Sequence, residues 1–184
     1  MTARHWIRRL VLALCLFPLV ATGHPLTAAA APVSVDNLTF TVPTTIQQGS
    51  LSPSIGSGHV VGDGWQWVGE TAGTGPLPST VVLARADLAA TDAGELLGLV
   101  LAGSATGMLP DLRLTNRRTR PMPGGGEQTR IGLEYSVGAG ATYHGELLIA
   151  TRPTLPAGLL VVLGNEQLTA ATVDGILESA RWRS

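Results

Sequence analysis

The segment RIGLEYSVGAGATYHGELLI, residues 130–149, contains two runs of alternating apolar and polar residues around a short glycine-rich stretch. Successive side chains of a β-strand point to opposite faces of a sheet, so this alternation predicts two half-buried strands. The stretch Gly138–Ala141 between them is typical of a hairpin turn. The segment therefore predicts an antiparallel hairpin, and with it a domain built on an antiparallel sheet.

Other strand-like runs lie on both sides of this hairpin. Residues 79–84 (STVVLA) and 159–163 (LLVVL) are continuously apolar, as central strands are. The remaining runs are rich in β-branched and aromatic residues and lie at 38–42, 59–70 and 112–120. Clusters of proline and glycine between the runs indicate turns. Residues 32–39 are interpreted as a short leader.

Two segments change to helical periodicity. In residues 96–108 apolar residues recur on one broad face, and Asp92 and Glu95 before them have the spacing of a capping box. Thr169 can cap a second helix, whose apolar stripe consists of Val173, Ile176, Leu177 and Ala180. An amphipathic helix buries its stripe against a sheet, so the predicted class is α+β: an antiparallel sheet of about six to seven strands flanked by two helices.

The N-terminus has the order of parts of a secretory signal peptide. Arg4, Arg8 and Arg9 precede an apolar run at 10–21, and the small residues of Thr27–Ala31 follow it. We predict a signal peptide at residues 1–31, cleaved after Ala30 or Ala31, and a single globular domain at 32–184. The apolar run is too short for a stable transmembrane anchor, which needs about 20 residues. The predicted location is secreted or extracytoplasmic, in the cell envelope.

Two variants of this signal have partial support in the residues. The pair Arg8–Arg9 could belong to a twin-arginine signal, but Ile7 precedes it and no phenylalanine follows it directly. Cys15 could carry a lipid, but Leu14 stands where a small residue is needed. A signal peptide without a lipid therefore agrees better with the residues.

The charge of the predicted mature domain argues against nucleic-acid binding. All its cations are arginines, and nine of them face thirteen acidic residues, a net charge of −4. Binding to nucleic acid depends on neutralising phosphates, which an acidic domain does poorly. Cleavage would also remove Cys15, the only cysteine, and with it any disulfide.

No catalytic, cofactor or metal site is predicted. The mature domain has two histidines, His59 and His144, and neither lies in a metal-ligand or triad motif. His144 and Glu146 share a strand face and are interpreted as an exposed charge pair. A hydrolase with a site near His59 or His144 is kept as an alternative.

Two residue groups could form a binding surface. The first is a set of arginines on two neighbouring strands, which could bind an anionic headgroup, a cell-wall polymer or the carboxylates of a partner: Arg113, Arg117, Arg118, Arg120 and Arg130. The same arginines could instead guard an exposed strand edge against aggregation. Trp65 and Trp67, two residues apart on one strand, could line a ligand groove or pack in the core.

Four segments carry a family resemblance: residues 38–43 (LTFTVP), 81–85 (VVLAR), 160–164 (LVVLG) and the closing helix 173–182 (VDGILESARW). They resemble the PsbP-like fold and, within it, actinobacterial LpqN-type envelope lipoproteins and alanine-and-proline-rich secreted antigens. The chain departs from that pattern because no Gly-Trp pair directly follows Pro43 and the lipidation box is missing. The resemblance implies an α/β/α sandwich and a binding or assembly role, and it carries no site residues.

The expected function is that of an exported, non-enzymatic binding or accessory protein of the cell envelope or medium. Its partner is expected to be an envelope protein, a polymer or a small apolar ligand. Besides the hydrolase, a carrier that encloses a small apolar ligand between sheet and helix is kept as an alternative.

Overall fold

The computed structural model describes residues 29–49, 54–55, 59–60, 65–71, 78–90, 92–105, 111–123, 125–137 and 140–183. The predicted signal peptide up to residue 28, with Cys15 and the arginine pair, lies outside these residues. The side chain of His59 also lies outside them. Among the described residues, no helix is both long and apolar enough to cross a membrane.

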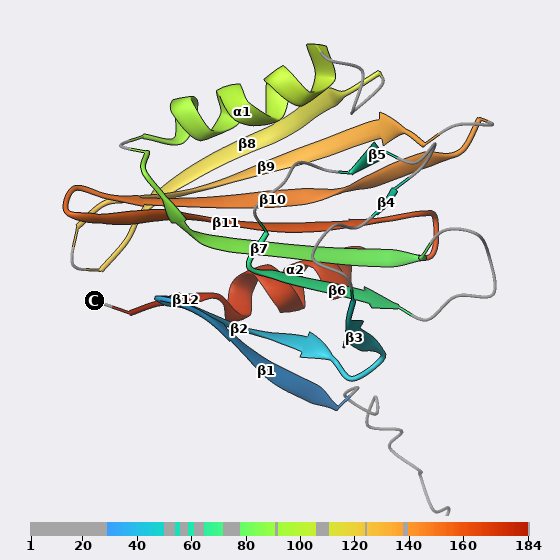
Figure 1. Cartoon of the computed structure of the whole chain (residues 1–184), viewed down its shortest axis with the longest axis horizontal. Helices are drawn as coiled ribbons and strands as arrows, with labels where there is room; N and C mark the ends of the chain where they lie inside the picture. Colours follow the sequence, from blue (N-terminus) through green and yellow to red (C-terminus); the bar gives the residue numbers. More distant parts are fainter. Residues whose placement is uncertain are drawn as a thin grey trace, which may run out of the picture.

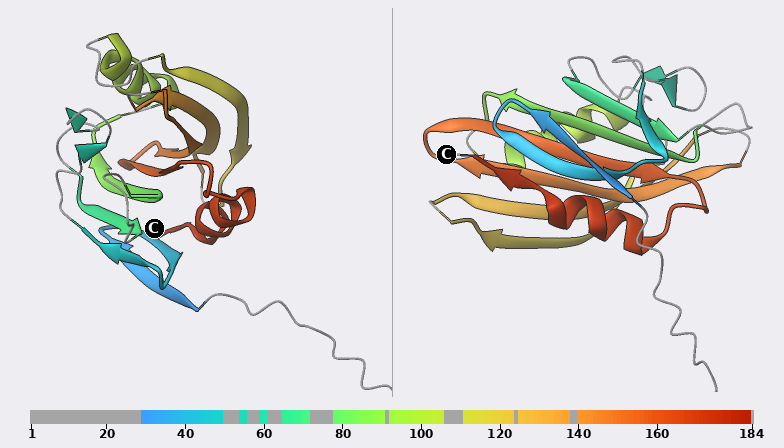
Figure 2. Two further views of the ribbon diagram at one scale, coloured as in Figure 1. Left: turned by 90° about the vertical axis from the view of Figure 1, so that its right-hand side faces the viewer. Right: turned by 90° about the horizontal axis from the view of Figure 1, so that it is seen from below.

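An antiparallel sheet of seven strands forms the centre of the molecule (Figure 1). Its order from edge to edge is β3 (Ile46–Gln48), β6 (Trp67–Thr71), β7 (Thr80–Leu88), β11 (Leu155–Gly164), β10 (Thr142–Arg152), β9 (Glu127–Ser136) and β8 (Arg113–Pro121). The predicted hairpin is β9–β10, with Tyr135 opposite Tyr143. Helices α1 (Ala93–Ala105) and α2 (Ala170–Ser179) lie on opposite sides of this sheet (Figure 2). The α+β class with two flanking helices is therefore confirmed.

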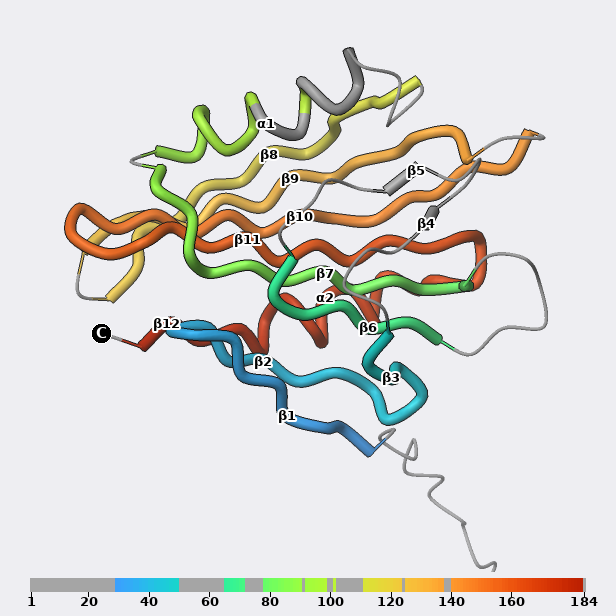
Figure 3. Tube along the Cα trace, in the orientation of Figure 1, coloured from blue at the N-terminus to red at the C-terminus, as the bar shows by residue number. Residues whose placement is uncertain are grey.

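A smaller sheet holds the N-terminal and C-terminal ends of the domain together. Strands β1 (Ala30–Val35), β2 (Leu38–Pro43) and β12 (Arg181–Trp182) pair antiparallel, with β2 in the middle (Figure 3). The interpretation of residues 32–39 as a leader is wrong, because most of them belong to β1 and its turn into β2. Pro32 is tolerated because β1 is an edge strand of this sheet.

The predicted single strand at 59–70 is also corrected by the structure. Its beginning is β5 (His59–Val60), which pairs with β4 (Ser54–Ile55), and only its end belongs to β6. The bend at Gln66 separates β6 from the residues before it.

Each face of the central sheet carries its own hydrophobic core. On the α2 side, Val173, Ile176 and Leu177 are buried together with residues of β2, and Thr169 Oγ1 accepts the N–H of Thr172 as the predicted cap. The apolar stripe and the cap predicted for this helix are therefore confirmed.

Helix α1 agrees with its prediction at the beginning and differs further along. Asp92 Oδ1 accepts the Glu95 N–H at 2.9 Å, and Leu96 is buried in the core on this side of the sheet. Leu101, predicted on the same face, is 45% exposed. Five residues correspond to about 140° around a helix axis, so a face that includes both leucines is too wide to be buried in one contact.

Two tyrosines in the α1-side core have hydroxyl groups in different situations. The rings of Tyr135 and Tyr143 meet edge to face, with centroids 6.1 Å apart. The Tyr143 hydroxyl donates to the carbonyl oxygen of Pro78, whereas the Tyr135 hydroxyl is buried without a partner among the described residues. Burial raises the pKa of both phenols, because a buried phenolate loses its hydration.

Tyr135→Phe is expected to leave the free energy of unfolding unchanged or to increase it by about 1 kcal/mol, because it removes an unsatisfied buried hydroxyl. Tyr143→Phe loses a hydrogen bond and should cost about 1 kcal/mol. Above about pH 10 the unfolded chain releases tyrosine protons that the folded chain retains, so stability falls as the pH rises. Urea melts between pH 8 and 11 should show a weaker fall for Tyr135→Phe than for the parent protein; an equal fall would contradict this account.

Candidate binding groove between β8 and α2

The α2-side face of β8, β9 and β10 carries polar residues where the other strands of the sheet are apolar. Residues paired across neighbouring antiparallel strands share a face, and the register therefore defines three rows of side chains. The rows run from β10 over β9 to β8 and consist of His144, Glu134 and Arg113, then Glu146, Gly132 and Thr115, then Leu148, Arg130 and Arg118.

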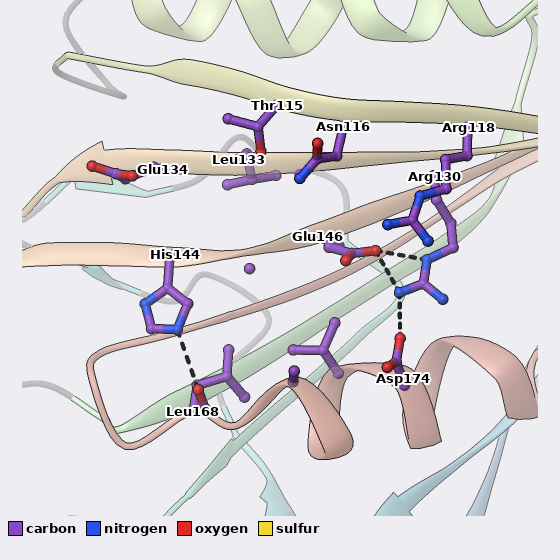
Figure 4. A pocket seen from close by; sticks show the side chains of 14 residues that line it. Thr115, Asn116, Arg118, Arg130, Leu133, Glu134, His144, Glu146, Leu168 and Asp174 are labelled. Atoms are coloured by element: carbon purple, nitrogen blue, oxygen red, sulfur yellow. Dashed lines mark hydrogen bonds and ion pairs between the residues drawn. The ribbon is translucent and has the colours of Figure 1, made fainter.

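A groove of about 420 Å³ lies between this part of the sheet and α2 (Figure 4). One wall is β8, with Thr115, Asn116 and Arg118. The other wall is formed by Leu168 and the first turns of α2, with Ala170, Val173 and Asp174. The remaining lining residues belong to β9 and β10 and are Arg130, Gly132, Leu133, Glu134, His144, Gly145 and Glu146.

Arg130 joins the sheet to α2 through ion pairs. Its Nε donates to Glu146 Oε2 at 2.6 Å, and its Nη2 lies 2.7 Å from Asp174 Oδ1 on α2. Glu178, one turn further along the helix, is 4.0 Å from Nη1. Burial lowers the pKa of Arg130, but hydrogen bonds with Asp174 and Glu146 outweigh it and raise the pKa. Only 16% of the Arg130 side chain is exposed, so its charge is engaged in ion pairs within the fold and is not available to a partner.

The four arginines of β8 are exposed at the edge of the sheet. Arg120 donates from Nε to Gln128 Oε1 at 2.7 Å. Arg113, Arg117 and Arg118 have no hydrogen-bond or ion-pair partner within the described part of the chain. The five arginines predicted as a binding surface therefore differ in their contacts. Arg130 is held in ion pairs inside the fold and Arg120 is hydrogen-bonded, whereas the other three have no partner among the described residues.

A β-bulge interrupts β8 between these free cations. The register passes from Thr115 opposite Gly132 to Arg118 opposite Arg130, so β8 has one residue more than β9 in this interval. Asn116 in the bulge has a φ of 48°, a conformation that asparagine tolerates better than most residues. The bulge keeps both Thr115 and Arg118 on the groove side, and it also makes the edge less suitable for pairing with another strand.

Two comparisons with known proteins gave no match: no family model and no curated protein sequence matches the chain. The third compared the structure with solved structures. It matches the solution structure of cyanobacterial PsbP (CyanoP) from Synechocystis sp. PCC 6803 with a TM-score of 0.56, over 90% of this chain and 99% of that one. The chain has the PsbP-like fold. The two sequences are 13% identical, so the likeness concerns the fold alone.

His144, a histidine of the PsbP-like domain whose side chain the structure describes, lies at one end of the groove. His144 Nε2 is 3.2 Å from the carbonyl oxygen of Leu168 (Figure 4). The interpretation of His144 and Glu146 as a charge pair is wrong, because Glu146 turns to Arg130 instead. Within the described ranges, no group of three His, Cys, Asp or Glu side chains could hold a metal ion.

The two tryptophans of the PsbP-like domain lie in different cores. Trp67 is buried on the α2 side and contacts Phe40 edge to face, with ring centroids 5.4 Å apart. Trp65 packs against the core on the α1 side. The expectation that both share a face is wrong, because Trp65 precedes β6 and the strand alternation does not extend to it. Neither tryptophan lines the groove.

No motif in the sequence predicts the α2 wall of the groove in this PsbP-like domain. Asp174 lies off the apolar stripe of its helix, and nothing in the local sequence connects it with Arg130, 44 residues earlier. One signal was available: the strand alternation puts Arg130 and Glu146 on the face opposite to the tyrosines, where charges need partners.

Proposed function

We propose that this chain is an exported, non-enzymatic binding or accessory protein of the cell envelope or medium, and that it holds its partner in the groove between β8 and α2. The observation that supports this is a polar groove of about 420 Å³ beside arginines that have no partner in the described part of the chain. Its volume is in the range of ligand sites, about 300–1,000 Å³. A relation to the LpqN-type envelope lipoproteins belongs to the same proposal and depends on residues 38–43, 81–85, 160–164 and 173–182.

Two features of the groove favour binding over the alternatives. The ring of His144 interacts with a backbone carbonyl, and no carboxylate or hydroxyl among the described residues forms a catalytic pair with it. Eight of the fourteen lining residues have charged or polar side chains, which suits a polar partner better than a small apolar cargo.

Export is supported by the order of residues 1–31, and it predicts a defined N-terminus. Cleavage after Ala30 or Ala31 would remove the first one or two pairs of β1 with β2, and the pairs from Pro32 to Val35 would remain. Mass spectrometry of protein recovered from the medium or envelope should find a chain that begins at Ala31 or Pro32. Recovery of intact Met1 in that fraction would contradict export, and a lipid on Cys15 would indicate a lipoprotein.

A substitution that fills the groove tests the binding role. Ala170 is exposed in the first turn of α2 and lines the groove, whereas its exposed neighbour Ala171 does not line it. Ala170→Trp should therefore lose a partner that the parent protein captures from envelope extract, and Ala171→Trp should retain it. Equal circular dichroism spectra and melting temperatures would show that both variants fold. If Ala170→Trp captures the same proteins, polymers and lipids as the parent, the groove is not the binding site.

A further inference from the structure

Arg118 lies opposite a second arginine, and no described carboxylate balances its positive charge. It lies directly opposite Arg130 on the neighbouring strand, and like charges in this position destabilise a strand pair. Arg130 forms ion pairs with Glu146 and Asp174, which balance its charge. No described residue does the same for Arg118, which is exposed on the β8 wall of the groove. An anionic group from another molecule would complete this position.

The other end of the groove carries the carboxylate of Glu134, with Arg113 opposite it on β8 but outside the groove lining. Glu134 is exposed, and among the described residues no ion pair or hydrogen bond engages its carboxylate. It lies four residues from Arg130 along β9, and therefore about 13 Å from the row of Arg118, since a strand rises about 3.3 Å per residue. Figure 4 shows Arg118 and Glu134 at opposite ends of the groove.

The middle of the groove combines paired charges with apolar surface. Glu146 and Asp174 form ion pairs with Arg130, and Ala170 and Val173 of α2 contribute apolar surface. Glu146 and Asp174 also line the groove, so an anion in the middle would meet carboxylates. The two ends suit opposite charges, and the middle suits uncharged groups.

We propose that the groove binds an extended peptide segment in which an acidic residue reaches Arg118 and a basic residue four positions away reaches Glu134. In an extended chain, residues four positions apart point to the same side and are separated by about 13 Å, which matches the separation of the two rows. Densely charged polyanions suit the groove poorly, because they would place further negative charges beside Glu134 and Asp174. This inference rests on the proposed function and names the class of partner.

Isothermal titration with short peptides tests the charge pattern. The probe is Glu-Thr-Val-Thr-Lys, acetylated and amidated so that only its side chains are charged, and the comparison peptide has glutamine at both ends. The parent protein should bind the charged peptide about tenfold or more tightly than the uncharged one, as expected when hydrogen bonds to charged groups are gained. Arg118→Gln should remove this preference. Arg85→Gln, a control at an arginine paired with Asp87 on β7, should retain it.

Reversing the charge at Arg118 distinguishes direct contact with the peptide from an indirect effect of the substitution on the fold. Arg118→Glu should lose the charged peptide and gain the peptide Lys-Thr-Val-Thr-Lys, because the position then attracts a cation. The inference is overturned if the parent protein shows no preference for the Glu/Lys peptide, if the exchange gives no rescue, or if polyphosphate binds more tightly than the peptide. If the peptides fail while Ala170→Trp still loses its partner from extract, this inference falls and the proposed function stands. If Ala170→Trp loses nothing, the proposed function fails.

Discussion

Leu177→Ala is expected to reduce the free energy of unfolding by about 2–5 kcal/mol, the range for a buried leucine that leaves a cavity. Leu177 is 1% exposed and packs in the core between α2 and the central sheet. The matched control is Glu178→Ala, one residue further along the same helix, where 68% of the side chain is exposed. The control should stay within about 0.5 kcal/mol of the parent protein.

Urea denaturation followed by circular dichroism measures both variants. A loss for Leu177→Ala as small as that for Glu178→Ala would mean that α2 is not docked on the sheet. The groove would then lose its second wall, because Ala170, Val173 and Asp174 all belong to α2.

Arg130→Met is expected to lower the free energy of unfolding by about 1–3 kcal/mol. This range extends from the contribution of an exposed ion pair to that of hydrogen bonds to a charged group. Methionine keeps much of the apolar stem but leaves the carboxylates of Glu146 and Asp174 close together without their common cation. The control is Arg118→Met, the same substitution at the residue directly opposite. It removes a like-charge neighbour and no ion pair, so it should stay within about 0.5 kcal/mol.

Salt provides a second measurement for this pair of variants. At about 1 M salt the electrostatic screening length falls to about 3 Å. The difference in the free energy of unfolding between the parent protein and Arg130→Met should therefore become smaller. An equal cost for Arg118→Met and Arg130→Met would show that the ion pairs with α2 add nothing to stability. Together with Leu177→Ala, this experiment separates the apolar and the ionic attachment of the helix.

The docking of α2 connects the fold with the site. Its apolar stripe packs on the central sheet, and Asp174, which lies off that stripe, reaches Arg130. One helix therefore closes the core and also forms a wall of the groove. We expect substitutions in its stripe to weaken both stability and binding, and substitutions at Ala170 to affect binding alone.

Several local features were predictable from the sequence because they depend on neighbours in the chain. The alternation in residues 130–149 predicted the β9–β10 hairpin, and the stripe and cap of residues 169–177 predicted α2. The same alternation placed Arg130 and Glu146 on one face. Strand and helix periodicities determine which side chains share a face, and these periodicities are properties of the local sequence.

Only the tertiary structure decided what those faces meet. The partner of Arg130 on α2 is 44 residues away, and no local pattern identifies it. Trp65 and Trp67 entered different cores because the chain bends before β6, and residues 30–35 became a strand because β2 offered them a partner. A single strand of this composition has no stable structure alone, so its pairing depends on contacts that exist only in the folded domain. The groove arises in the same way, since its two walls come from segments that meet only after the sheet and α2 have packed.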